Sequence, residues 1–151
     1  RMYWVGEPPI KAKRLTQVTY DAMMKGIEQV RPGNTTGDIG HAIQSYAESY
    51  GYSIVREYCG HGLGRVFHDA PNILHYGEPG KGVLLEEGMF FTVEPMVNAG
   101  KPETRLNPND GWTVTTKDRS LSCQFEHSCG VTASGVDIFT TSPKGLHFPS
   151  Y

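Results

Sequence analysis

Residues 58–68 read Tyr58-Cys-Gly-His-Gly-Leu-Gly-Arg-Val-Phe-His68, a glycine-rich segment with one histidine inside it and another at its end. The glycines around His61 let the backbone pass close to another group and adopt φ values that other residues avoid. Further along the chain, Glu94 and Glu126 both have aromatic or apolar neighbours. Imidazole and carboxylate groups are ligands that hold divalent transition metals. The first hypothesis is therefore a metal centre built from these three side chains.

The two glutamates are expected to be costly to bury alone. Residues 121–132 alternate like a strand, which places Glu126 on the face opposite Phe125, and Glu94 ends an apolar run. A buried carboxylate needs a cation or a proton, and one shared divalent ion beside the histidine would serve both. For either glutamate alone, a solvated or salt-bridged strand residue is the better interpretation. For the three residues together we favour metal.

Other side chains near this stretch have alternative interpretations. His68 stands beside Phe67 at the start of a loop, which suits a histidine that holds or protonates a reacting carbonyl. The alternative interpretations of His68 are a fourth metal ligand and a packed loop histidine. Cys59 could be a nucleophile or a soft ligand, but a small packed residue is the better interpretation. His75 fits a structural role as well as a functional one.

The composition argues against several classes of protein. A length of 151 residues suffices for one domain with a core. The net charge is −2 and no basic cluster extends beyond Lys11-Ala-Lys-Arg14, which argues against nucleic-acid binding. No apolar run approaches the ~20 residues that span a bilayer. The 3 cysteines include no CxxC pair, which favours the reducing cytoplasm.

Hydrophobic periodicity predicts two amphipathic helices followed by antiparallel strands, an α+β class. Apolar residues at steps of three or four predict one helix through residues 15–30. Thr35 with Asp38 forms a capping arrangement for a second helix that ends at Gly51. Strands are expected at residues 1–5, 52–58, 89–94, 112–116, 121–132 and 136–139, with loops at 69–82 and 101–111 and a loosely held tail from residue 140.

Three long motifs follow one another along the sequence. The first is Arg56-Glu-Tyr-Cys-Gly-His-Gly-Leu-Gly-Arg-Val-Phe-His68 with Pro71-Asn-Ile-Leu-His-Tyr76. The second is Gly88-Met-Phe-Phe-Thr-Val-Glu-Pro-Met-Val-Asn98, and the third runs from Asp110-Gly-Trp-Thr-Val through Asp118-Arg-Ser-Leu-Ser-Cys-Gln-Phe-Glu-His127. In these motifs the sequence resembles the type I methionine aminopeptidases. The resemblance covers nearly the whole chain, and motifs of this length in this order are specific. Prolidases share the histidine and glutamates but are less similar in the flanking segments.

The resemblance implies a pita-bread fold, in which two pseudo-symmetric halves enclose a site for two divalent metal ions. By this resemblance His61, Glu94 and Glu126 are metal ligands, with Glu126 bridging both ions and Glu94 also acting as general acid/base. Carboxylate and imidazole ligands accept Co, Mn, Fe or Zn, so the metal is not distinguished.

The implied activity is metal-dependent removal of the N-terminal methionine from nascent proteins, by a cytoplasmic methionyl aminopeptidase. The resemblance assigns His68 to contact with the scissile peptide. It places Phe67 and Trp112 at the border of the pocket for the methionine side chain, which selects by shape.

The sequence departs from the family in one respect. Family members have five metal-binding side chains, of which two are aspartates from the N-terminal half, and no aspartate of this chain matches either position. Residues 1–151 are therefore expected to form a single domain, the C-terminal segment of a catalytic domain with an incomplete pita-bread fold. Activity is expected only when the N-terminal segment completes it. The edge at residues 1–5 is expected to pair with that segment or with another copy. The alternative is a non-catalytic fragment that binds a peptide or a partner.

Overall fold

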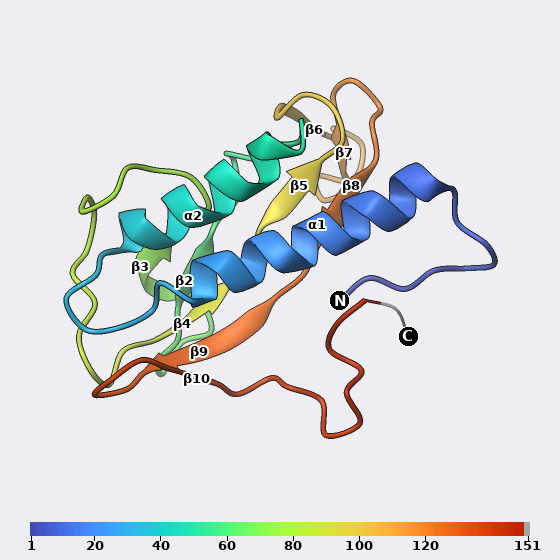
Figure 1. Ribbon diagram of the computed structural model, residues 1–151. Coiled ribbons are helices and arrows are strands. Elements are labelled where there is room, and N and C mark those ends of the chain that lie inside the picture. Colours follow the sequence, from blue (N-terminus) through green and yellow to red (C-terminus); the bar gives the residue numbers. More distant parts are fainter. Residues whose placement is uncertain (150–151) are drawn as a thin grey trace.

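The computed structural model describes residues 1–149. Residues 150 and 151 of the predicted domain lie outside the described residues. Two helices lie side by side over one face of a layer of antiparallel strands (Figure 1). This arrangement confirms the α+β class and the packing of two amphipathic helices on antiparallel sheets. No helix within the described range is both long and apolar enough to cross a membrane.

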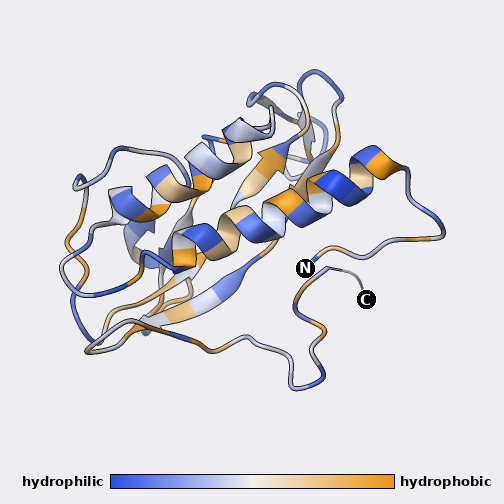
Figure 2. Ribbon diagram, viewed as in Figure 1, coloured by the Kyte–Doolittle hydropathy of each residue, from blue (hydrophilic) through white to orange (hydrophobic). Residues whose placement is uncertain are grey.

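The helices follow the predicted apolar stripes. Helix α1 spans Ile10–Ile27 after Pro9, whose extended backbone starts it, and α2 spans Thr36–Ser49 after a capping box made by Thr35 and Asp38. Hydrophilic and hydrophobic residues alternate along both helices (Figure 2). Their apolar faces are buried against the strands. The buried residues of these faces are Leu15, Val18, Ala22, Met23, Ile27, Ile39, Ile43 and Ala47.

Within residues 1–149 the strands form three antiparallel sheets. The five-stranded sheet has the order β10-β9-β4-β2-β3, the three-stranded sheet β1-β5-β8, and the smallest is the hairpin β6-β7. Their bounds are β1 Ser53–Ile54, β2 Gly60–Gly62, β3 Asp69–Ile73, β4 Phe90–Val93, β5 Met96–Asn98, β6 Thr104–Leu106, β7 Val114–Thr116, β8 Ser122–Gln124, β9 His127–Val131 and β10 Val136–Ile138.

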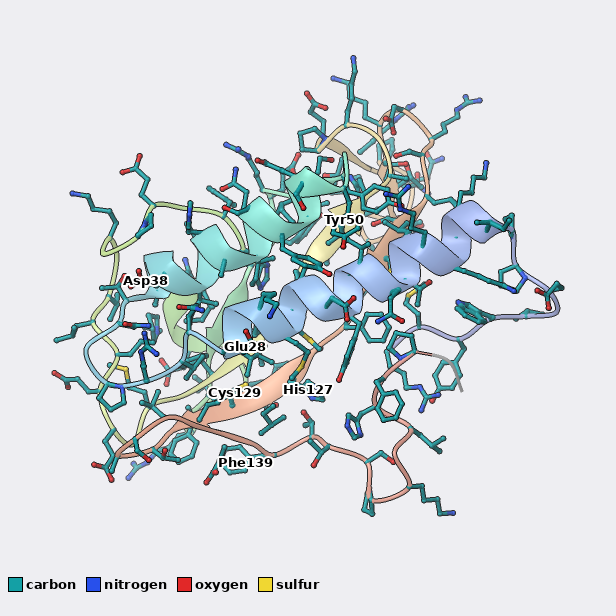
Figure 3. All side chains as sticks on the ribbon, in the orientation of Figure 1. Glu28, Asp38, Tyr50, His127, Cys129 and Phe139 are labelled. Atoms are coloured by element: carbon teal, nitrogen blue, oxygen red, sulfur yellow. The ribbon has the colours of Figure 1, made fainter. Side chains whose placement is uncertain are left out.

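The core lies between the helices and one face of these sheets. It includes Phe91 and Val93 of β4, Val97 of β5 and Cys129 of β9, all fully buried. Figure 3 shows His127 and Cys129 on β9, below α1 in that view. The alternation of a strand places the neighbouring residues on the opposite face, which the helices do not cover. We call this opposite side the open face.

The structure corrects the prediction of a loop over residues 69–82. Asp69–Ile73 is strand β3, paired with β2. Pro71 is accommodated because β3 is the last strand of its sheet, where a missing N–H need not interrupt a ladder. Likewise Thr104–Leu106, expected in a loop, pairs with β7. Of the strand predicted over residues 52–58, the structure has a strand at Ser53–Ile54, which pairs with β5.

The prediction for the two ends of the chain was also wrong in part. Residues 1–5 are irregular rather than a strand, and they belong to none of the sheets formed within residues 1–149. The Arg1 guanidinium instead donates to the carbonyl of Leu146. The tail is anchored where it leaves β10, since the Thr140 hydroxyl accepts the Ser128 N–H at 3.0 Å.

Candidate active site

Glu94 and Glu126 lie at matching breaks in two paired chain segments. Strand β4 pairs with β9 up to Val93↔His127, and β5 pairs with β8 from Met96↔Gln124. The predicted single strand over residues 121–132 is therefore two strands in two sheets, interrupted at the glutamate. The two carboxylates come from adjacent segments, so their negative charges interact. Burial is the largest cause that raises the pKa of Glu94, and this interaction adds to it.

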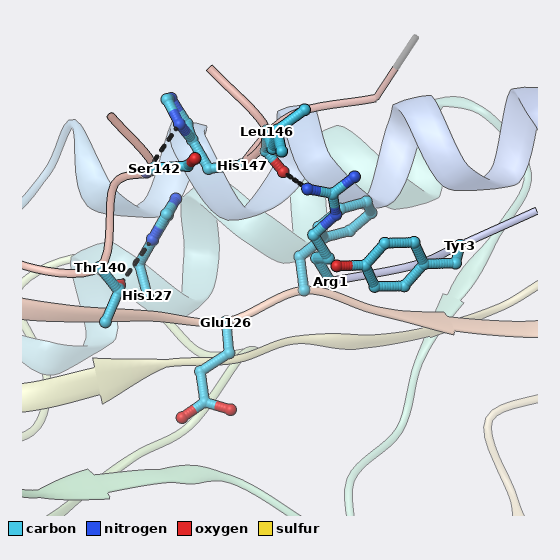
Figure 4. A pocket seen from close by; sticks show the side chains of 9 residues that line it. Arg1, Tyr3, Glu126, His127, Thr140, Ser142, Leu146 and His147 are labelled. Atoms are coloured by element: carbon cyan, nitrogen blue, oxygen red, sulfur yellow. Dashed lines mark hydrogen bonds between the residues drawn. The ribbon is translucent and has the colours of Figure 1, made fainter. Parts of the chain in front are cut away.

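The alternation predicted around Glu126 is confirmed, but its burial is not. Phe125 and His127 are buried, whereas Glu126 is exposed. Figure 4 shows the reason: Glu126 and His127 point to opposite sides of the chain, with His127 directed toward Thr140 and the tail. Glu126 belongs to the open face, where a carboxylate keeps its hydration unless another group covers it.

His61 is presented to the same face from β2. Its ring Nδ1 lies 2.9 Å from the Gly62 carbonyl, and since a carbonyl can only accept, Nδ1 carries the proton. The lone pair is then on Nε2, which lies 3.6 Å from Oε1 of Glu94. A histidine fixed in this tautomer by a backbone carbonyl is suited to ligate a metal through Nε2.

Glu94 is partly buried, and burial is the largest cause that raises the pKa of its carboxyl above the usual range. Thr92 donates its hydroxyl to Glu94 Oε1 at 2.7 Å. The backbone N–H of Glu94 donates to Nε2 of His75 at 3.0 Å. Burial lowers the pKa of His75 to about 3, which keeps its imidazole neutral. Glu94 is therefore held both through its side chain and through its main chain.

The aromatic residues of the glycine-rich stretch gather at His61. Its ring lies 4.4 Å from that of His68 and 5.5 Å from that of Phe67, measured between centroids. Phe67 is 73% exposed, so its ring is available to a ligand. Cys59 is close enough for the charge of Glu94 to add to burial in raising the pKa of its thiol. A raised pKa disfavours the thiolate that a nucleophile requires, consistent with a packed residue.

Within residues 1–149, no ring contact joins Trp112 to His61, His68 or Phe67. It lies between β6 and β7 with 86% of its surface exposed. Its backbone N–H donates to Asp110 Oδ1 at 2.9 Å. The role of Trp112 at the methionine pocket stays a prediction.

The residues present fit part of a metal centre. His61 and Glu94 offer a free imidazole lone pair and a carboxylate oxygen 3.6 Å apart, which is the donor chemistry that divalent transition metals prefer. Glu126 lies on the paired segment, yet in the described residues no three His, Cys, Asp or Glu side chains are close enough to hold an ion. The three-ligand centre and its bridging role for Glu126 therefore stay predictions.

Sequence reasoning missed Thr92 and left His75 undecided. The period of a strand contained a signal for Thr92, because it lies two residues before Glu94 and must share its face. No sequence pattern places His75, in the segment after β3, against the main chain of Glu94.

Comparisons with known proteins identify the family of the chain. Residues 1–133 match metallopeptidase family M24. The chain is 68% identical over 151 residues to the methionine aminopeptidase of Rickettsia prowazekii and 51% identical over 140 residues to that of Escherichia coli K12. It spans 58% and 53% of their respective lengths.

Solved structures give the same result for the fold. The crystal structure of the Rickettsia prowazekii methionine aminopeptidase aligns with a TM-score of 0.91, covering 93% of this chain and 56% of that one. The prolidase from Pyrococcus furiosus, at 24% identity, aligns with a TM-score of 0.67 over 91% of this chain and 35% of that one, a likeness of fold alone.

The fold and the site together define a class, an α+β chain of the pita-bread type whose open sheet face carries imidazole and carboxylate groups. More narrowly, this chain belongs to metallopeptidase family M24, and within that family it is similar to methionine aminopeptidases.

Proposed function

We propose that the protein containing this chain removes the N-terminal methionine from polypeptides in a metal-dependent reaction in the cytoplasm. The observation that carries the proposal is the 3.6 Å approach of His61 Nε2 to Glu94 Oε1 on an open face that also presents Glu126. It occurs in a chain 68% identical to a methionine aminopeptidase. The 3 free cysteines are compatible with a reducing compartment.

In this proposal His61, Glu94 and Glu126 hold two divalent ions. When bound, such ions polarise the scissile carbonyl as Lewis acids and lower the pKa of water. The chain's own residues do the rest. Glu94, with its raised pKa, accepts a proton from the attacking water and returns it to the leaving amine. His68 donates a hydrogen bond to the scissile peptide, and Phe67 borders the methionine side chain, with Trp112 completing that pocket.

We further propose that a segment outside residues 1–151 supplies the remaining ligands and covers the open face. Support comes from the length of the relatives, of which this chain spans 58% or less in the two cases above. Another copy of this chain is the second candidate for that role. In both cases the covering segment would bury Glu126 and Phe67, which are exposed here.

The proposal is tested with a peptide that begins Met-Ala, the complete protein and added Co²⁺ or Mn²⁺. We expect release of free methionine, and a loss of at least about 100-fold in kcat for Glu94→Gln because the proton acceptor is removed. Glu87→Gln, the same substitution at an exposed glutamate, is the matched control and should keep full activity. Peptide binding without release of methionine would support the non-catalytic alternative instead.

A further inference from the structure

The Glu94 carboxylate has a dedicated side-chain contact that the proposed chemistry does not itself require. Thr92 is 1% exposed, and its hydroxyl donates to Glu94 Oε1 at 2.7 Å. The hydroxyl oxygen of Thr92 also accepts the backbone N–H of His61 at 3.0 Å. One hydroxyl therefore connects the carboxylate to the backbone of the residue that carries the imidazole.

The close fit of β2 against β4 makes this connection possible. A Cβ at Gly60 would lie 3.1 Å from the Thr92 hydroxyl and closer still to the Thr92 carbonyl. Any larger residue at this position would push β2 away from β4. The glycine before His61 thus allows the Thr92 hydroxyl to reach the His61 amide.

A second contact holds Glu94 through its main chain. His75 is 2% exposed and accepts the Glu94 N–H through Nε2 at 3.0 Å. The residues on either side of His75 rest directly on helix α2, because a Cβ at Gly40 would overlap the carbonyls of Leu74 and Tyr76. The imidazole is thereby fixed to the helix layer, and it fixes the point where β4 ends and Glu94 begins.

We propose that Thr92 and His75 are positioning residues that set the Glu94 carboxylate against the His61 imidazole, Thr92 through the side chain and His75 through the main chain. The inference rests on the proposed function in that Glu94 and His61 are taken as parts of the working site. The simpler role for both residues is to satisfy buried polar groups of the fold. A structural role would affect stability, whereas a positioning role also affects metal affinity and kcat.

The experiment compares substitutions that keep or remove the contacting group in the complete protein. Thr92→Val removes the hydroxyl at nearly constant shape, and Thr92→Ser restores it. His75→Leu removes the acceptor, and His75→Gln supplies an oxygen near the position of Nε2. Thr19→Val is the matched control, since Thr19 is fully buried and donates to Leu15 within α1, away from the site.

Two readouts are measured for every variant that retains a cooperative thermal transition. The first is the dissociation constant of Co²⁺ by calorimetry together with its visible absorption spectrum, with no substrate present. The second is kcat and KM for a methionyl peptide. We expect Thr92→Val and His75→Leu to weaken Co²⁺ binding about 10- to 100-fold, to change the cobalt spectrum, and to lower kcat more than KM changes. Thr92→Ser and His75→Gln should remain within about threefold of the parent.

The outcomes separate this inference from the proposed function. Unchanged Co²⁺ affinity and kcat in both Thr92→Val and His75→Leu would overturn the positioning role, and so would an equal effect of Thr19→Val. A parent protein that binds Co²⁺ but releases no methionine would refute the function alone, while a loss of Co²⁺ affinity in Thr92→Val would still support positioning. If Thr92→Val does not fold, the comparison of His75→Leu with His75→Gln decides whether the positioning role holds.

Discussion

At the scale of single residues, Glu126 combines exposure with proximity to a second carboxylate. Its side chain points away from the helices while the neighbouring Phe125 and His127 are buried. Burial is the main cause that raises the pKa of the Glu94 carboxyl, and the charge of Glu126 on the paired segment adds to it. Two carboxylates held together at one site repel each other, and a divalent cation relieves that repulsion.

We therefore predict that Glu126→Ala abolishes metal retention and peptidase activity in the complete protein. The physical reason is the loss of a ligand that both ions would share. Metal content after dialysis and methionine release check the prediction. Glu103→Ala, at another exposed glutamate, should keep the metal, and undiminished content in the Glu126→Ala protein would contradict the assignment.

Residue types could be assigned to the site from sequence, but their mutual placement could not. The setting of His61 and Glu94 was sufficient to predict that they meet, and the structure brings them to 3.6 Å. The same reasoning expected Glu126 to be buried, and this was wrong for the described chain. Aromatic neighbours in sequence show which residues flank a side chain, but in a strand they lie on the other face.

At the scale of elements, helix α2 shows how one local motif starts a helix and joins it to a loop. Asp38 accepts the Thr35 N–H at 2.7 Å and, through its other oxygen, the Gly80 N–H at 3.1 Å. Burial alone would raise its pKa, but these hydrogen bonds outweigh burial and lower the pKa of Asp38 below its ordinary value.

We predict that Asp38→Ala lowers the free energy of unfolding by about 1 kcal/mol at pH 7, since a capping interaction is lost. The stabilisation from Asp38 is fully present above the unfolded pKa of 3.8. It is lost as the pH falls below that value through the lower folded pKa. Denaturant unfolding at pH 7 and pH 3 checks this, with Asp137→Ala, at an exposed position of β10, as control. Equal losses at both pH values would contradict it.

Helices were predictable from sequence and several strands were not, for a physical reason. The stripe from Leu15 to Val30 and the Thr35 cap are local signals. Strands β3 and β6 contain proline or polar residues, and they exist because the adjacent strands β2 and β7 pair with them, which their own residue types do not indicate. The end of a strand at Glu94–Pro95 was predicted from the sequence. The matching break at Glu126 was not, because it depends on which sheet each half of residues 121–132 joins.

At the scale of the whole molecule, the helix layer and the open face differ in how far they shield cysteine thiols from solvent. Cys123 and Cys129 are buried under the helices. Burial raises the pKa of their thiols to about 11 and about 12. Cys59 lies at the edge of the open face with intermediate exposure. The three thiols therefore report separately on the core and on the site.

We predict that, in the folded protein, a thiol reagent modifies Cys59 first, and that Cys123 and Cys129 react only at the rate of unfolding. A buried thiol with a raised pKa has little thiolate and no access to the reagent. Because the folded pKa values exceed the unfolded value of 9.0, the stabilisation from the two buried thiols is complete below pH 9 and declines as the pH rises above it. Mass spectrometry of peptides after timed labelling measures all three sites, and Cys59→Ser removes the fast phase. Modification of Cys129 as fast as Cys59 would show that the helix layer does not seal the core.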